Sequence, residues 1–239
     1  MDTLKKNYAE RSEAYPVTAT FMSGVFMWMF LALAVSATTA WLFASNANLI
    51  GMLYNMETGG MSVMGWVVML APLGLVLWMS AGYQRMSAST MILVFILFSV
   101  LLGASLSSIF ILYTSASIAK TFLITAGMFG TMAVVGYTTK TDLTRFGSIM
   151  FMGLIGIIIA SVVNMFMHSS TMDYIISFIG VLVFTGLTAY DVQKLKRMGS
   201  QVEPGSEGAR KITIMGALTL YLDFINLFLF LLRFFGNRK

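Results

Sequence analysis

Seven long apolar runs, almost free of charge, constrain this chain more than any other feature of its sequence. The runs cover residues 17–44, 61–80, 91–113, 121–138, 146–167, 174–190 and 212–232. A helix needs about 20 apolar residues to cross the hydrocarbon of a bilayer, and each run is near that length or above it. The runs are continuously apolar rather than alternating, so they predict helices and not barrel strands. The predicted fold class is an all-α integral membrane protein with seven transmembrane helices.

The composition agrees with this class. Hydrophobic residues make up 58% of the chain and charged residues 10%, whereas a soluble domain averages about 25% charged residues. There is no cysteine, which excludes disulfides and thiol chemistry. The net charge of +5 resides in short connections between apolar runs, a pattern typical of membrane topology and not of nucleic-acid binding.

The basic residues also predict the orientation and the organisation of the chain. Lys and Arg precede the first run and gather between the last two runs, at Lys194, Lys196, Arg197, Arg210 and Lys211. The positive-inside rule therefore favours a cytoplasmic N-terminus. We expect a cytoplasmic segment over 1–16 and a single transmembrane domain over 17–235, with a polar loop at about 192–211. The last run is long enough to cross, which would place the basic tail on the opposite side.

Small residues recur within the runs at the spacing of helix contacts. Examples are Gly127 with Gly130 and Gly153 with Gly156. Such residues commonly let membrane helices approach closely, so we expect these glycines to lie at helix–helix contacts.

Two acids stand out because a charge inside a bilayer is costly. Asp223 lies 12 residues after Lys211, which places it roughly 18 Å into the last run, near the membrane midplane. Asp191 ends the preceding run. Consecutive antiparallel helices are usually neighbours, so the two carboxyl groups can approach each other. An ionisable residue within a span is a candidate functional site by default.

Other polar groups fall near this pair. Arg85 closes the second run on the same side of the membrane, and Asn226 follows Asp223 by three residues, on the same helix face. Two carboxylates in contact tend to share a proton, which predicts a proton-sensitive latch. Carboxylate oxygens are also the ligands that Ca²⁺ prefers, so Asp191 and Asp223 are candidate calcium ligands.

The segments GLTAYDVQKLK and ALTLYLDFINLFLFLLRFFG closely resemble the paired C-terminal signatures of the Bax inhibitor-1 family, whose bacterial branch includes the modulator of the FtsH protease. The stretches QRMSAST and LLGASLSSIFILY also resemble that family. The resemblance implies six helices packed around a central seventh, in a bacterial inner membrane. It implies a pH-sensitive calcium leak, an aspartate pair at Asp191 and Asp223, and Arg85 as the partner of the pair.

Alternative functions remain open. The protein could be a non-conducting regulator that binds a membrane protease or another membrane partner. Intramembrane aspartyl proteases also carry a Tyr-Asp on one span, as in Tyr190-Asp191, but their second aspartate follows Gly-x-Gly, and residues 220–222 here are LYL. We therefore expect no enzyme. His168 is the single histidine, so no metal site is expected there and no cofactor is predicted beyond calcium as the transported ion.

Overall fold

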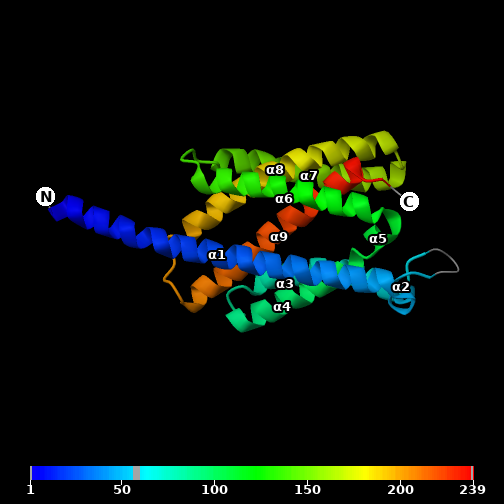
Figure 1. Ribbon diagram of the computed structural model, residues 1–239, viewed down its shortest axis with the longest axis horizontal. Coiled ribbons are helices and arrows are strands. Elements are labelled where there is room, and N and C mark those ends of the chain that lie inside the picture. The colour runs from blue at the N-terminus through cyan, green and yellow to red at the C-terminus, as the bar shows by residue number, and fades with distance from the viewer. Residues whose placement is uncertain (1, 56–59, 238) are drawn as a thin grey trace. The chain divides into compact units, whose positions relative to one another are not determined.

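The computed structural model of the chain describes residues 2–55, 60–237 and 239. For residues 2–17 it describes the backbone alone, and from residue 18 onward it describes the side chains of these ranges as well. In these ranges it contains nine helices and no β-sheet. The helices are α1 (Asp2–Ser45), α2 (Ala47–Leu53), α3 (Val63–Gly82), α4 (Ala88–Ser105), α5 (Ser108–Leu112), α6 (Ser115–Thr138), α7 (Thr144–Met167), α8 (Ser170–Gly199) and α9 (Glu207–Phe235) (Figure 1).

Seven helical segments among the described residues are long and apolar enough to cross a bilayer. They are Thr18–Ser45, Val63–Gly82, Ala88–Leu112, Ser115–Thr138, Thr144–Met167, Ser170–Gly199 and Glu207–Phe235. Each contains most or all of one of the predicted apolar runs. The prediction of an all-helical membrane protein with seven spans is therefore confirmed.

Short polar side chains fix where several of the spans begin. Ser62, Ser87, Thr114 and Ser169 each precede a helix and accept a hydrogen bond from a backbone N–H of its first turn. These contacts satisfy donors that the helix itself leaves unpaired. The apolar runs therefore begin at defined residues, although their own sequences carry little turn information.

The polar connection before the last span is shorter than the loop predicted over 192–211. Helix α8 continues through Gly199 and α9 begins at Glu207, so only residues 200–206 connect them. The segment QKLKRM consists of good helix formers, and its Lys196 and Arg197 lie in the last turn, where cations interact favourably with the helix dipole. Asp191 consequently lies well inside α8 and not at its end.

The helices fall into two compact units. The first comprises Met1–Thr18, Thr114–Gln201 and Thr219–Arg238. In this unit α8 packs against both α6 and α7. The C-terminal part of α9 contributes aromatic side chains, and Phe224 makes edge-to-face contacts with Phe122 and Phe129 of α6, with ring centroids 5.4 and 5.5 Å apart.

Glycines allow the closest approaches in the first unit, but not at the predicted positions. A Cβ on Gly136 of α6 would lie 2.2 Å from the Ala189 carbonyl oxygen of α8, and one on Gly147 of α7 would meet the Tyr190 ring at 2.4 Å. A Cβ on Gly153 would meet Val183 at 2.9 Å, whereas one on Gly127, Gly130 or Gly156 would have no described atom within 4 Å. The predicted contact role is thus wrong for three of the four glycines, because spacing alone does not tell which helix face meets protein and which meets lipid.

The second unit comprises Ala19–Tyr113, Val202–Leu218 and Lys239. Helices α3 and α4 pack together, and α1 approaches α4 where Ser36 donates a 2.7 Å hydrogen bond to the carbonyl of Ser99. The first turns of α9 lie against the connection between α3 and α4, since Glu207 accepts a hydrogen bond from the Ala88 N–H and Lys211 lies 5.4 Å over the Tyr83 ring.

The last span is the most deeply buried of the seven. Of its most apolar window 67% is buried, against 11% for Thr144–Met167. High burial of the last span is what the predicted arrangement of six helices around a seventh requires. The arrangement itself stays a prediction, because the two units are described separately.

Candidate functional site

The two predicted acids lie together in the first unit. Asp191 of α8 and Asp223 of α9 are close enough for their carboxyl groups to act on each other directly. Asp223 is 5% exposed. Among the described residues, its Oδ2 is the one buried side-chain oxygen or nitrogen atom without a hydrogen-bond partner. The structure therefore brings together the two residues that the sequence paired.

Neighbouring residues on both helices fix the position of the pair. The backbone at Ala189 lies against Gly136 of α6, and the Tyr190 ring lies against Gly147 of α7, so the turn of α8 that carries Asp191 is held on two sides. On α9, Phe224 follows Asp223 directly and contacts Phe129 of α6. Helix α6 thus contacts both partner helices close to the acids.

The chemistry of the pair follows from its inventory of donors and acceptors. Two ionised carboxylates offer only acceptors, and they repel each other in a buried setting. One shared proton turns one of them into a donor and removes the repulsion. The arrangement can therefore hold or release a proton, with opposite effects on the contact between α8 and α9.

A cation lies beside the pair in the same unit. Lys194 follows Asp191 by three residues on α8 and is close enough to act on its carboxyl group by charge, while its Nζ lies 5.9 Å from the centre of the Tyr190 ring. Sequence reasoning did not single out Lys194. The spacing of three residues on a helix was the signal that could have identified it.

The other predicted residues lie as follows. Arg85 belongs to the second unit, where it is exposed in the turn between α3 and α4. Asn226 donates a 2.8 Å hydrogen bond to the Leu222 carbonyl of its own helix. Partnership of Arg85 or Asn226 with the acid pair stays a prediction. His168 ends α7 in the left-handed region, at φ 52°.

The pair alone offers few ligands for a resident metal ion. In the described part of the chain, no group of three or more His, Cys, Asp or Glu residues is placed to hold a metal. Two carboxylates provide at most four oxygens, whereas Ca²⁺ takes six to eight ligands. The donor set therefore suits brief contact with a passing ion better than storage of a bound one.

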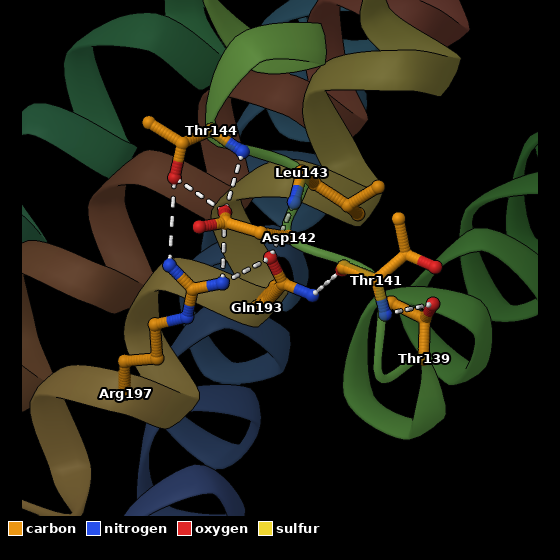
Figure 2. Close-up of polar contacts among 7 residues, drawn as sticks. All are labelled: Thr139, Thr141, Asp142, Leu143, Thr144, Gln193 and Arg197. Carbon is orange, nitrogen blue, oxygen red and sulfur yellow. Dashed lines mark hydrogen bonds and ion pairs between the residues drawn. The ribbon is translucent and has the colours of Figure 1, made fainter.

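A second polar cluster, which sequence reasoning missed, lies where α8 meets the connection between α6 and α7 (Figure 2). Arg197 of α8 forms a 2.9 Å ion pair with Asp142, whose Oδ1 also accepts hydrogen bonds from the hydroxyl and the backbone N–H of Thr144. These bonds from Thr144, together with Arg197, hold the pKa of the Asp142 carboxyl well below its usual range.

Gln193 ties the same connection to α8. Its side chain is buried, donates to the Thr141 carbonyl and accepts from the Leu143 N–H, each at 2.8 Å. The signal in the sequence was a short polar connection facing the basic end of α8. A polar connection usually indicates a solvated loop, and for that reason the cluster was not anticipated.

Seven helical spans, two of which share a pair of acids whose Asp223 is buried, define a multi-pass integral membrane protein with an ionisable pair inside its spans. A family model described as "Inhibitor of apoptosis-promoting Bax1" matches residues 18–239. The chain belongs to the Bax inhibitor-1 family, as the resemblance in its sequence predicted.

Curated relatives support this assignment over nearly the whole chain. The chain is 50% identical to "Inner membrane protein YbhL" of Escherichia coli strain K12 over 221 residues, which cover 92% of each protein. It is 46% identical to a protein of Borreliella burgdorferi, again over 92% of each chain. It is 43% identical to the protein RP147 of Rickettsia prowazekii, over 92% of this chain and 90% of the relative.

Proposed function

We propose that this protein is a pH-sensitive calcium-leak channel of the Bax inhibitor-1 type, gated by Asp191 and Asp223. The observation that carries the proposal is the contact of two carboxyl groups inside the spans, with one Asp223 oxygen buried and without a donor. Intramembrane acids are rare and commonly serve ion or proton pathways. Calcium is the transported ion in this proposal and not a resident cofactor.

The gating step follows from the charge on the pair. With one proton shared, α8 and α9 stay in contact at Asp191 and Asp223. When that proton leaves, two negative charges face each other in a medium of low dielectric constant, and the repulsion favours separation of the two helices. Separation would also make carboxylate oxygens available to a calcium ion. The leak is therefore expected to increase as the pH rises.

The proposal also includes the type of membrane and the orientation of the chain in it. The relative YbhL is named an inner membrane protein, and we assign this chain to the same type of membrane. The Lys and Arg residues before the first span and between the last two spans favour a cytoplasmic N-terminus. In this orientation the connection between α8 and α9 faces the cytoplasm.

Calcium entry into liposomes tests the proposal. The full chain is reconstituted with a calcium dye inside the vesicles, and entry is recorded over a series of pH values. Asp223→Asn and Asp191→Asn should abolish the pH dependence. Asp173→Asn should keep it, because this acid of α8 is half-exposed and pairs with Arg233 near the other end of the helix, at 3.5 Å.

The outcomes separate the candidate functions. If Asp223→Asn follows the wild-type pH profile, the acid pair is not the gate. If wild-type vesicles admit no calcium at any pH, the channel proposal fails, and a non-conducting regulator of a membrane protease or another membrane partner becomes the better interpretation. Cleavage of a transmembrane peptide that is lost in Asp223→Ala would instead indicate an intramembrane protease.

A further inference from the structure

A basic cavity lies beside the second polar cluster, in the first unit. It has a volume of about 210 Å³ and is lined by three cations, Lys140, Lys196 and Arg197, with the hydroxyl-bearing residues Thr139 and Ser200 among them. None of the described lining residues is acidic. Pockets for drug-sized ligands measure about 300–1,000 Å³, so this cavity suits a single small anionic group.

The cavity lies at the ends of spans on one side of the membrane. Thr139 directly follows α6 and Ser200 directly follows α8, and alternate spans end on the same side of a bilayer. Helix α8 has 30 residues, which corresponds to about 45 Å, whereas the hydrocarbon core is about 30 Å thick. The end of α8 therefore reaches the level of the lipid headgroups, where phosphate groups are abundant.

Two of the three cations of the cavity, Lys196 and Arg197, are held in place before any ligand binds. Lys196 donates a 2.7 Å hydrogen bond to the Tyr137 carbonyl and lies 4.7 Å over the ring of the same residue. Arg197 is oriented by its 2.9 Å ion pair with Asp142 and by a 3.0 Å hydrogen bond to Gln193 (Figure 2). Their side chains lose little freedom on binding, which favours affinity.

The charges do not balance within the cluster. Asp142 offsets one of the three cations, and its oxygen is already engaged by Arg197 and Thr144. Lys196 retains two N–H donors beyond its bond to the Tyr137 carbonyl. A surplus of positive charge, with N–H donors still available in a small cavity open to the surface, is complementary to a phosphate group.

We propose that this cavity binds the phosphate group of an anionic ligand at the membrane surface. Basic pockets between transmembrane helices commonly receive anionic headgroups, and a phosphodiester can accept hydrogen bonds from both lysines and from Arg197. The phosphate can come from an anionic phospholipid of the surrounding bilayer or from a soluble phosphate compound. The cavity lining does not include Asp191 or Asp223, and the proposal does not depend on ion conduction.

Lipid binding to the full chain tests the proposal. The protein is placed in nanodiscs of phosphatidylcholine that contain increasing amounts of phosphatidylglycerol, and bound phosphatidylglycerol is counted by native mass spectrometry. Lys140→Gln and Lys196→Gln should each weaken binding about fivefold. Arg145→Gln removes the same charge from an exposed position in the first turn of α7, outside the cavity, and should leave binding unchanged.

A second arm distinguishes the source of the phosphate. Inorganic phosphate is titrated onto the detergent-solubilised protein, and its effect on thermal unfolding is compared between the wild type and the same three variants. A phosphate effect that is lost in Lys140→Gln, without selective loss of phosphatidylglycerol, supports the site and assigns it to a soluble ligand. Lys140 is exposed in the connection between α6 and α7, so this variant should fold.

Two results would overturn the proposal. In the first, neither lysine variant changes the binding of phosphatidylglycerol or of inorganic phosphate. In the second, Arg145→Gln weakens binding as much as the lysine variants do, which would mean that only the general basic charge of this surface acts. Because no readout involves calcium, failure here leaves the proposed channel activity unaffected.

Discussion

At the scale of single residues, Asp223 combines a buried position with an unsatisfied oxygen. Its helix neighbours Leu220, Tyr221 and Phe224 are buried as well, so water is excluded from its surroundings. A buried polar atom without a partner costs about 1–3 kcal/mol. Such a cost persists in a protein where it serves a function, which for this residue we place in the contact with Asp191.

A neutral replacement of Asp223 should not harm the fold. In Asp223→Asn the side-chain amide can donate a hydrogen bond to Asp191, and no second negative charge remains in the contact. The free energy of unfolding at neutral pH should be unchanged or higher by about 1 kcal/mol. Thermal unfolding in detergent measures this free energy. Asp173→Asn is the control, because it removes a half-exposed ion pair that contributes little to stability. A clear loss of stability in Asp223→Asn would mean that an ionised carboxylate stabilises the fold.

Asp142, which lies outside the spans, makes the stability of the folded protein depend on pH. The hydrogen bonds from Thr144 and the charge of Arg197 lower the pKa of Asp142 in the folded protein. A lowered pKa stabilises the folded state fully above the unfolded value of about 3.9, and this contribution is lost progressively as the pH falls from that value through the lowered pKa of the folded protein.

We therefore expect Asp142→Asn to melt slightly below the wild type at pH 7, with a difference that begins to shrink below about pH 4, near the unfolded pKa, and closes only as the pH approaches the lowered pKa of the folded protein. The side chain is exposed, so solvent screening keeps the difference small. Melting curves of both proteins over this pH range provide the measurement. A difference of the same size at every pH would mean that the ionised form of Asp142 contributes nothing.

At the scale of helices, α6 organises the first unit. Its Gly136 permits backbone contact with α8 at Ala189, and its Phe129 contacts Phe224 of α9, next to Asp223. The separation of the two acids therefore depends on how closely α6 approaches both partners. Positions on α6 should influence the pair without touching it.

Gly136→Ala tests that dependence. The added methyl group would collide with backbone atoms of Ala189, and overpacking of this kind costs about 1–3 kcal/mol. Gly127→Ala is the matched control on the same helix, since its Cβ would meet no described atom within 4 Å and the change favours helix formation. Unfolding in detergent should show a loss for Gly136→Ala alone. Equal stability of the two variants would contradict the close approach of α6 and α8.

The same helices show what could be predicted from the sequence. The spans were predictable because lipid imposes a length and an apolar composition on them, and Asp191 and Asp223 were conspicuous because charge is costly there. Packing faces were not predictable from Gly127 and Gly130. A span is apolar on all sides, so no periodic polar face shows which side meets protein.

The missed residues have a related explanation. Gln193, Asp142 and Arg197 lie at the aqueous end of a span, where polar side chains are common and carry no evident cost. Their importance depends on geometry: Gln193 is buried only because the connection between α6 and α7 folds over it. Chain order alone could not show that residues 50 positions apart share hydrogen bonds.

At the scale of the whole molecule, the direction of the last span decides where the two termini lie. Helix α9 is continuous over 29 residues, about 43 Å, which exceeds the hydrocarbon thickness of about 30 Å. A continuous helix of this length crosses the bilayer and does not enter and return. We therefore expect the basic tail to lie on the side of the membrane opposite the basic connection between α8 and α9, although the positive-inside rule by itself would favour a cytoplasmic tail.

Single cysteines can test this topology cleanly, because the chain has no cysteine of its own. Gln201→Cys lies in the connection between α8 and α9, Ser170→Cys at the start of α8, and Lys239→Cys in the tail. In intact spheroplasts, a membrane-impermeant maleimide should label Ser170→Cys and Lys239→Cys, whereas Gln201→Cys should react only after lysis. Protection of Lys239→Cys together with Gln201→Cys would show that the tail is cytoplasmic. The seventh helix would then not cross, and the acid pair could not lie between two antiparallel spans.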